Sequence, residues 1–562
     1  MKKVLLGNEA IVQGALEARV EFVSTYPGTP ASEIGDIFSK IAGESGVYFE
    51  FSTNEKVALE AAIGASFSGL RCLVAMKNFG LNVCSDSLLP FCYTGSRGPF
   101  VIIVGDDPGC WSSAQSEQNS RAYAYLAHIP ILEPSDAQEA KDFVKLGFEI
   151  SEKFGIPVIV RTTTRVAHQR MPIVINPKSE IHWIRSRLLA ELHLKQKGKF
   201  IKDVKKFVTM PPRVLEMKRE LLEKIEKIRE FAERVNGDRV PVNRDSVSAN
   251  LGIITSGISY LYVKEVLEEF DLDIPVLKLD FFYPLPEKKI KTFIKGLKKV
   301  LIVEELEGYL EKEVRALAKE INCKLDIFGK NFLPNTGELN SKKVLSAVIK
   351  ILNKKVKIPI PLKNKNFETG IPIRYPTLCQ GCPYWSSFSI IKEMAPQGTI
   401  FGGDIGCYMI AGFPPHNIQD YLLSMGSSIG IGHGVKKAIG NKEKLIALIG
   451  DSTFFHAGIP ALINAVYNNS NPLIIVMDNR ITAMTGHQPN PGMGETGMGE
   501  VSEGIDIEKI VKACGVKNVK TIDPVNSEEF KNTLNEFLNK KEVSVIISKK
   551  ICAYYARKTG KN

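Results

Sequence analysis

The segment from residue 450 to residue 480 constrains the fold of this chain more than any other. It reads GDSTFFHAGIPALINAVYNNSNPLIIVMDNR. One apolar strand ends at Asp451, a helix-forming stretch follows, and a second apolar strand ends in Asp-Asn at Asn479. In a strand-helix-strand unit both ends lie at the carboxyl edge of a parallel sheet, where open α/β sheets bind ligands. The pattern therefore predicts a ligand site with Asp451 and Asn479 on neighbouring strands.

Two hard oxygen ligands at such an edge suit Mg²⁺. This ion takes few protein ligands and completes its octahedral shell with phosphate oxygens and water. We include Gly450 and Ser452, which flank the aspartate, in the predicted site. The competing interpretation is that Gly-Asp-Ser only turns a strand into a helix, since Asp and Ser are good N-caps.

Length and composition limit the possible classes of protein. A chain of 562 residues should divide into several domains. Its 73 basic and 62 acidic residues give a net charge of +11, but they are interspersed, without the aromatic-basic pattern of a nucleic-acid groove. No stretch reaches about 18 uninterrupted apolar residues, so no membrane span is expected. The N-terminus does not resemble a signal peptide, and we expect a cytoplasmic protein.

The pattern of strands and helices indicates an α/β fold with three parallel-sheet, helix-covered units. Residues 1–175 alternate β-branched runs with helices, and residues 176–245 form a basic, helical connector. The alternation returns in residues 246–352. A Pro- and Lys-rich linker, residues 353–372, leads to a third α/β unit, residues 373–562.

Four cysteines of the third unit have the spacing of a metal or cluster site. Cys379 and Cys382 form a C-x-x-C, Cys407 follows in GDIGCY, and Cys552 comes after the last predicted strand. Four thiolates are what a 4Fe-4S cluster needs. A structural zinc site is the rival, and ordinary core or free thiols are the third possibility.

The segment at residues 450–480 resembles the metal and diphosphate site of thiamine diphosphate enzymes. These enzymes hold the cofactor between two related domains and often carry a third. The resemblance implies a pyrimidine-binding domain in residues 1–175, a transketolase C-terminal-like domain in residues 246–352, and a diphosphate- and Mg²⁺-binding domain in residues 373–562.

In this class a glutamate contacts the aminopyrimidine ring and helps to activate the cofactor. The segment NEKVALEAAIGASFSG resembles the family pattern, and it assigns this role to Glu55. Glu60 on the same helix is the competitor, at a position better suited to packing or a solvated face. The alternative is that Glu55 has no catalytic role and is an ordinary glutamate at a helix start, where the helix dipole stabilises its charge.

Over nearly its whole length the chain resembles the large (alpha) subunits of indolepyruvate ferredoxin oxidoreductases, of the thiamine diphosphate-dependent 2-oxoacid:ferredoxin oxidoreductase superfamily. The segments that carry the resemblance are long and non-repetitive: GNEAIVQGALEA, YPGTPASEI, NEKVALEAA, GLNVCSD, SSAQSEQNSR, LCQGCPYW, GDIGCY, GDSTFFHAGIPALINAVYN and DNRITAMTGHQPNPG.

The resemblance implies oxidative decarboxylation of an aryl 2-oxoacid with coenzyme A to an acyl-CoA and CO₂. Electrons would pass through one 4Fe-4S cluster to ferredoxin. It also implies that the carbonyl of Ile481 joins Asp451 and Asn479 on Mg²⁺, that Thr29 contacts the substrate carboxylate, and that His487 is an active-site residue. A small (beta) subunit is the expected partner, in a hetero-oligomer.

The chain departs from the family pattern in two places. The family usually continues into a ferredoxin-like domain with further cysteine motifs, whereas this sequence stops at Asn562. Either that domain has been removed or another subunit carries the electrons onward. Asn78 stands where histidine is expected, which leaves the chemistry around Lys77 and Asn78 open.

Two other functions compete. One is a non-oxidative thiamine diphosphate-dependent decarboxylase or synthase with structural cysteines. The other is a catalytically silent scaffold that uses its basic surface to bind acidic ferredoxin or a partner subunit, against which the intact set of predicted site residues argues.

Overall fold

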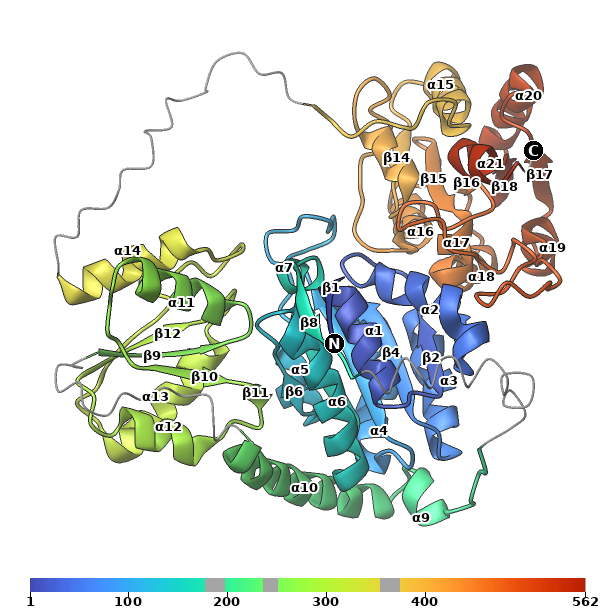
Figure 1. Ribbon diagram of the computed structural model, residues 1–562. Helices are drawn as coiled ribbons and strands as arrows, with labels where there is room; N and C mark the ends of the chain where they lie inside the picture. The colour runs from blue at the N-terminus through green and yellow to red at the C-terminus, as the bar shows by residue number, and fades with distance from the viewer. Residues whose placement is uncertain (177–197, 236–250, 354–373, 561–562) are drawn as a thin grey trace. The chain divides into compact units, whose positions relative to one another are not determined.

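The computed structural model describes residues 1–176, 198–235, 251–353 and 374–560. The chain divides into two compact units, residues 1–359 and residues 360–562. Figure 1 shows the elements of each unit. Each unit is described by itself.

Unit 1 is built on a seven-stranded sheet in the order β11-β6-β7-β5-β4-β2-β3. All neighbours are parallel except β11, which runs antiparallel to β6. Every residue of β4, β5 and β7 is buried, as expected when helices cover both faces of a parallel sheet. The strands are β2 (Phe22–Thr25), β3 (Tyr48–Phe51), β4 (Cys72–Lys77), β5 (Phe100–Asp106), β6 (Ile131–Leu132), β7 (Val158–Thr163) and β11 (Phe281–Tyr283).

Five helices lie between the successive strands from β2 to β7, so each of those connections is a crossover. Where β4 ends, α4 begins at the next residue, and where β7 ends, α7 begins at the next residue. The helices are α1 (Gly7–Glu17), α2 (Ser32–Ser45), α3 (Glu55–Phe67), α4 (Asn78–Thr94), α5 (Ala122–Ala127), α6 (Ala137–Phe154) and α7 (Thr164–Ala167). A separate antiparallel pair joins β1 (Lys2–Leu6) and β8 (Arg170–Val174).

The described part of the predicted connector contains two helices, α9 (Val204–Phe207) and α10 (Arg213–Val235). The long helix α10 is amphipathic. Its buried residues recur every three or four positions and form one face, namely Met217, Leu221, Ile225, Ile228 and Ala232. The rest of α10 is rich in Lys, Arg and Glu. Residues 177–197 and 236–245 of the predicted connector lie outside the described residues.

A second, smaller sheet of unit 1 has four parallel strands in the order β10-β9-β12-β13. The strands are β9 (Leu251–Ser256), β10 (Val276–Leu279), β12 (Lys299–Val303) and β13 (Asp326–Phe328). The helices are α11 (Ser259–Glu269), α12 (Glu287–Ile294), α13 (Tyr309–Ile321) and α14 (Ser341–Leu352).

A buried ion network joins the two sheets of unit 1. Arg121 is 2% exposed, and its guanidinium binds Glu133 through two bonds of 2.6 and 2.7 Å. It also donates to Ser256 at the end of β9 and contacts Glu304 after β12. Burial alone would raise the pKa of Glu133, but the charges of Arg121 and Arg161 lower it to about 2. Strand β11 makes a second connection, because it follows β10 in the chain yet pairs with β6.

Unit 2 holds a five-stranded parallel sheet in the order β14-β15-β16-β18-β17. The strands are β14 (Ile400–Gly402), β15 (Leu445–Gly450), β16 (Leu473–Asp478), β17 (Asn518–Ile522) and β18 (Ser544–Lys549). The helices are α15 (Tyr384–Met394), α16 (Ser427–Ile439), α17 (Asp451–Thr453), α18 (Ile459–Tyr467), α19 (Ile507–Ala513), α20 (Ser527–Leu538) and α21 (Ala553–Thr559), with a 3₁₀ turn at Cys407–Gly412 and a π-helical turn at Phe454–Gly458.

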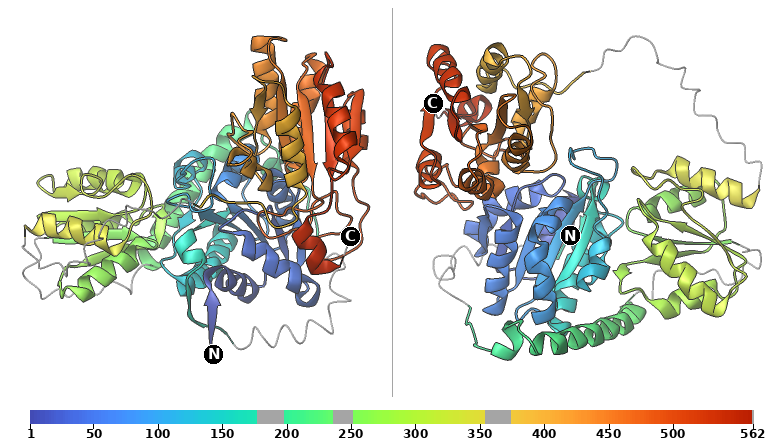
Figure 2. Two further views of the ribbon diagram at one scale, coloured as in Figure 1. Left: turned by 90° about the horizontal axis from the view of Figure 1, so that it is seen from above. Right: turned by 180° about the vertical axis from the view of Figure 1, so that it is seen from behind.

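Alternate residues of the strands build two cores, one on each face of this sheet. Ile446, Leu448 and Ile475 pack with α15 and α20. Ala447 and Ile474 pack with α16, α18 and α19 on the other face. The period of two is that of a strand buried on both sides. Both views in Figure 2 show helices flanking the strands of this unit.

The predicted α/β class with parallel sheets is confirmed. The sequence reasoning overlooked β1, β3, β8, β11 and β17, four of which are partly exposed strands and one of which joins a distant sheet. The predicted linker at 353–372 lies, apart from its first residue, outside the described residues. Within the described part of the chain, no helix is both long and apolar enough to cross a membrane.

Replacing Arg121 by Ala should lower the free energy of unfolding of unit 1 by about 3–5 kcal/mol, because it leaves buried carboxylates without a partner. Arg165→Ala is the matched control. Its ion pair with Glu338 is just as short, at 2.6 Å, but the arginine side chain is 57% exposed, so the loss should stay below about 1 kcal/mol. Denaturant unfolding measures both, and equal losses would contradict the importance of the buried network.

Candidate active site

Four strands of the five-stranded sheet deliver polar side chains to one edge. Asp404 follows β14, Asp451 follows β15, Asn479 follows β16, and Cys552 follows β18. These strands are neighbours and parallel, so their carboxyl ends meet at the same edge of the sheet. The structure thus places Asp451 and Asn479 where the sequence predicts.

Asp451 is the most unusual group at this edge. It is 3% exposed and lies beside Asp478, which is 2% exposed. Burial, and after it the charge of Asp478, raises the pKa of Asp451 well above its usual value. Its oxygens accept hydrogen bonds from the Ser452 amide (2.7 Å) and from Asn490 Nδ2 (3.1 Å). Two buried carboxyl groups side by side suit a divalent cation, which would remove their repulsion.

The segment after β16 carries the other oxygen groups. Asn479 is 6% exposed and its Oδ1 accepts a bond from the Ile481 amide at 3.2 Å. The Asn479 carbonyl accepts a bond from the Cys552 amide at 3.1 Å. Arg480 lies 3.7 Å from Asp478. A carboxylate, an amide oxygen and a backbone carbonyl are a donor set that fits Mg²⁺.

Gly450 is required by the close packing of Tyr408 against the turn. A Cβ at Gly450 would lie 2.5 Å from the Tyr408 ring. The Tyr408 hydroxyl donates to the Ile405 carbonyl at 2.8 Å and contacts Thr453 Oγ1 at 3.1 Å. This ring therefore ties the loop after β14 to the turn that carries Asp451.

The four predicted cluster ligands lie close enough in unit 2 for their charges to affect one another. Burial raises the pKa of the Cys407 thiol to about 12, and the charges of Cys382, Cys552 and Cys379 add to the effect. The pKa of Cys382 rises to about 11, with burial again first and Cys552 and Cys379 contributing. Asp451 also acts on Cys407. The thiols therefore lie near one another and near the carboxylate.

Two contacts explain how the loop at Cys379 meets the C-terminal helix. The Cys382 amide donates to the Cys379 carbonyl at 3.0 Å, which closes a tight turn. Arg557 of α21, the helix that follows Cys552, donates to the Gln380 carbonyl at 2.8 Å. Among the described residues, no three His, Cys, Asp or Glu side chains are arranged closely enough to hold a metal ion as they stand.

His487 packs against α21, the helix that follows Cys552. Its ring stacks on Tyr554 of α21 with centroids 5.0 Å apart. Burial, assisted by Lys558, lowers the pKa of His487, which favours the neutral ring. The backbone of His487 has a φ of 68°, in the left-handed region that residues other than glycine seldom adopt.

The carboxyl edge of the seven-stranded sheet carries the two predicted residues of unit 1, Thr29 and Glu55, together with Lys77 and Asp107. Thr29 follows β2, Glu55 follows β3, Lys77 ends β4, and Asp107 follows β5. These strands are also parallel neighbours, so the four residues reach one edge. The Thr29 carbonyl accepts a bond from the Ser112 hydroxyl at 3.1 Å.

Glu55 is the first residue of α3 and is 7% exposed. The preceding Asn54 caps the helix by accepting a bond from the Val57 amide at 2.9 Å. A Cβ at Gly80 of α4 would lie 2.7 Å from Glu55 Cγ, so α4 packs directly on the carboxyl side chain. Glu60, the competitor, is 46% exposed and lies 3.5 Å from Lys56.

Asn78, where the sequence resemblance leads us to expect histidine, is 1% exposed. Its Nδ2 donates to the Gln118 carbonyl at 3.4 Å, and its own carbonyl accepts a bond from Gln118 Nε2 at 3.1 Å. The residue therefore fastens the start of α4 to the loop that precedes α5.

Sequence reasoning missed three buried polar residues at the edge in unit 2: Asp404, Asp478 and Asn490. Asp404 accepts bonds from the amides of Gly426 and Ser428 and orders the start of α16. Burial raises its pKa to about 6. The sequence did offer a signal for Asp478, because it directly precedes Asn479 at the end of an apolar strand. Asn490 has no local signal, because a loop brings it back to Asp451.

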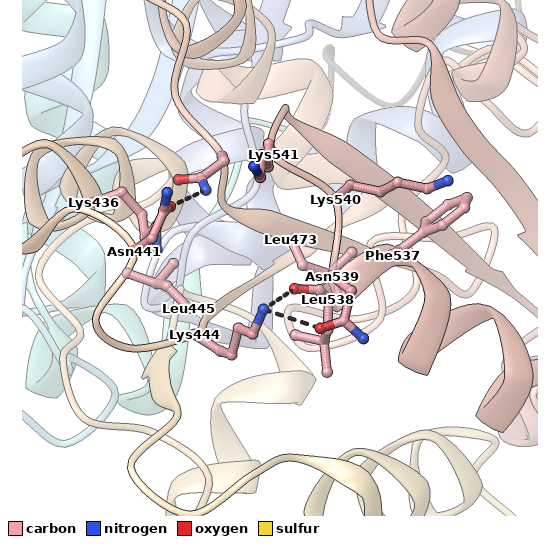
Figure 3. A pocket seen from close by; sticks show the side chains of 11 residues that line it. Lys436, Asn441, Lys444, Leu445, Leu473, Phe537, Leu538, Asn539, Lys540 and Lys541 are labelled. Carbon is pink, nitrogen blue, oxygen red and sulfur yellow. Dashed lines mark hydrogen bonds between the residues drawn. The ribbon is translucent and has the colours of Figure 1, made fainter.

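A pocket of about 130 Å³ lies at the opposite, amino edge of the five-stranded sheet, next to the first residues of β15 and β16. Figure 3 shows Lys444 donating to the Leu538 carbonyl and to Asn539. The Lys436 amine donates to the Glu443 carbonyl. These lysines support the backbone of the pocket wall, away from the strand ends that carry Asp451 and Asn479.

Comparisons with known proteins decide the family. Residues 404–548 match the family model "Thiamine pyrophosphate enzyme, C-terminal TPP binding domain", and residues 13–237 match "Pyruvate flavodoxin/ferredoxin oxidoreductase, thiamine diP-bdg". The indolepyruvate oxidoreductase subunit IorA of Pyrococcus horikoshii is 43% identical over 99% of this chain and 86% of its own length. The chain belongs to the family of indolepyruvate oxidoreductase subunit IorA.

Other relatives agree. The subunit IorA of Methanothermobacter marburgensis is 44% identical over 98% of this chain and 86% of its own length. Among solved structures, a 2-oxoglutarate:ferredoxin oxidoreductase from Magnetococcus marinus aligns with a TM-score of 0.49 and 18% identity. That alignment covers 62% of this chain and 65% of that one.

Membership of the IorA family establishes the cofactor class and the coarse chemistry. The chain is a thiamine diphosphate-dependent oxidoreductase subunit, and its relatives support oxidative decarboxylation of a 2-oxoacid.

Proposed function

We propose that this IorA-family subunit oxidatively decarboxylates an aryl 2-oxoacid of the indolepyruvate type with coenzyme A, yielding an acyl-CoA and CO₂, and passes the electrons through one 4Fe-4S cluster to ferredoxin. The observation that supports the proposal is the carboxyl edge of the five-stranded sheet, where Asp451 and Asn479 follow neighbouring strands and Asp451 interacts with the thiol of Cys407.

The cofactor's diphosphate and its Mg²⁺ would be held in unit 2. Asp451, Asn479 and the carbonyl of Ile481 are the proposed metal ligands, with Gly450 and Ser452 beside the diphosphate. The raised pKa of Asp451 supports this assignment, because a buried acidic pair is unfavourable until a cation joins it. Asn490 positions Asp451 by its hydrogen bond.

Unit 1 would supply the groups that act on the organic part of the cofactor and substrate. Bound thiamine diphosphate would supply a nucleophilic carbon and the electron sink that decarboxylation needs. Glu55 would hold and move a proton at the aminopyrimidine ring. Its burial under Gly80 supports this role, because the site excludes water from the carboxyl group. Thr29 would contact the carboxylate of the substrate. His487, a residue of unit 2, is also proposed as an active-site residue.

The cysteines would hold the cluster that removes electrons from the active site. Cys379, Cys382, Cys407 and Cys552 are the proposed ligands. Four thiolates on two loops and a helix start are a suitable set for 4Fe-4S. The proximity of Cys407 to Asp451 supports electron transfer from the bound cofactor, since both lie at the same strand ends.

The partners follow from the names of the relatives. Each is called a subunit of indolepyruvate oxidoreductase, which supports an aryl 2-oxoacid substrate and a small (beta) partner subunit in a hetero-oligomer. Ferredoxin is the electron acceptor proposed for this one-electron chemistry. The proposed compartment is the cytoplasm, because ten free cysteines suit a reducing environment.

The three parallel sheets also support a division of roles. We assign pyrimidine binding to residues 1–175 and a transketolase C-terminal-like role to residues 246–352. Residues 373–562 would bind diphosphate, Mg²⁺ and the cluster, while residues 176–245 and 353–372 connect these parts.

Asp451→Asn should weaken Mg²⁺-dependent binding of thiamine diphosphate by at least about 10-fold, the loss seen when even an outer partner of a metal ligand is disturbed. The thermal midpoint of the cofactor-free protein should rise, because the substitution removes one of two buried, neighbouring carboxyl groups. Calorimetric titration and thermal unfolding measure these effects.

Asp523→Asn is the matched control. Asp523 is 48% exposed and pairs with Lys550 on the surface of the same unit, so neither quantity should change. Unchanged cofactor affinity in Asp451→Asn would remove Asp451 from the metal site.

Glu55→Gln should abolish turnover of the 2-oxoacid with an artificial electron acceptor, while leaving Mg²⁺-dependent cofactor binding and iron content intact. The amide keeps the shape of the side chain but cannot take up the proton. Glu60→Gln, on the exposed face of the same helix, should keep near-normal activity. Retained activity in Glu55→Gln would show that another group activates the cofactor.

A further inference from the structure

Lys77 is a nearly buried cation at the active edge of unit 1 to which no role has yet been given. It is the last residue of β4, and its side chain is 11% exposed. Its amine donates to the carbonyl of Ser112 at 3.0 Å and to the hydroxyl of the same residue at 3.3 Å. A lysine amine has three N–H groups, so these contacts account for two of them.

The carboxylate nearest to Lys77 is fully engaged with other donors. Asp107 Oδ2 lies 3.9 Å from the amine. That same oxygen accepts bonds from the Ser112 amide at 2.8 Å and from the Ser113 hydroxyl at 2.7 Å. It also shares the one proton of the Ser112 hydroxyl with the Thr29 carbonyl, each 3.1 Å away. Asp107 Oδ1 accepts a bond from Thr164 at 2.6 Å. Lys77 and Asp107 therefore form only a long ion pair. A buried cation without a close counter-ion is unfavourable.

Lys77 is also joined to the two residues already assigned to the site. A Cβ at Gly28 would lie 2.8 Å from Lys77 Cβ, so the loop carrying Thr29 rests on this side chain. Ser112 bonds both the Lys77 amine and the Thr29 carbonyl. On the other side, Lys77 directly precedes α4, whose Gly80 packs on Glu55.

We propose that Lys77 binds the carboxylate of the 2-oxoacid substrate through its remaining N–H group. This inference rests on the proposed function, since it requires a 2-oxoacid at the edge that carries Glu55 and Thr29. The ring of Phe79 lies 5.4 Å from the amine and offers an apolar surface beside the charge, which suits an aryl substrate.

The protonation of Lys77 supports the proposal. Burial lowers its pKa to about 8, while Asp107 and Cys110 oppose the shift. The charged amine is therefore lost as the pH rises through about 8. Affinity for a carboxylate should fall over the same range, whereas a guanidinium at this position stays charged.

The test uses the complete enzyme with its cofactors, and compares Lys77→Gln and Lys77→Arg with the natural protein. Lys77→Gln should raise the KM for the aryl 2-oxoacid by about 10–100-fold, the value of a hydrogen bond to a charged group. The kcat should change much less, because the interaction is made in the ground state. Lys56→Gln is the matched control, since Lys56 is more exposed and pairs with Asp86 on the surface.

Two further readouts separate substrate binding from a purely structural role. The natural enzyme should bind phenylacetate, an aryl carboxylate probe, more tightly than its neutral amide, and Lys77→Gln should lose this preference. The KM of the natural enzyme should rise above about pH 8, and that rise should be absent in Lys77→Arg. Thiamine diphosphate affinity, measured by titration, should be the same in all variants.

The outcomes distinguish this proposal from the function on which it rests. If the natural enzyme turns over no 2-oxoacid, the proposed function fails. If it turns over the acid, but Lys77→Gln keeps both the natural KM and the preference for phenylacetate, the role of Lys77 is overturned. A fall in kcat and cofactor affinity with unchanged KM would assign Lys77 to the structure of the loop at Ser112 instead.

Discussion

The direction of the parallel strands determines where chemistry can occur in this protein. In the five-stranded sheet, β14, β15, β16 and β18 all end at one edge, and each is followed by a segment that carries a polar or cysteine side chain. The seven-stranded sheet repeats the arrangement with β2, β3, β4 and β5. Because backbone pairing fixes the strand ends next to one another, residues far apart in the sequence reach one site without long loops.

These edges concentrate charges that are unfavourable for folding. Asp451 and Asp478 are buried together, and Lys77 is buried with its nearest carboxylate 3.9 Å away. By contrast, the buried charges that join the two sheets of unit 1 are closely paired, with Arg121 making two short bonds to Glu133. The buried charges between the two sheets are neutralised within the chain, whereas those at the strand ends lack a close partner of opposite charge, which is the state we expect of a ligand site.

The sequence predicted the local part of this account well. Strand-helix-strand periodicity was enough to place Asp451 and Asn479 on neighbouring strands. The assignment of the four cysteines to one cluster, made from their spacing, stays a prediction. It could not predict Asn490, which a loop returns to Asp451, or strand β11, which leaves its own sheet to pair with β6. Nor could it show that Asp107 is occupied by hydroxyl donors. Such features depend on contacts between distant segments, which have no periodic signal along the chain.

We propose that this one subunit binds both thiamine diphosphate and an iron-sulfur cluster that accepts electrons from it. The most direct test is to measure iron and acid-labile sulfide per chain after anaerobic purification. The account predicts about four of each, as expected for one 4Fe-4S cluster on four thiolates. Both should be lost in Cys379→Ala and kept in Cys323→Ala, which alters an exposed cysteine of the other unit. A folded protein that binds thiamine diphosphate but contains no iron would contradict the account.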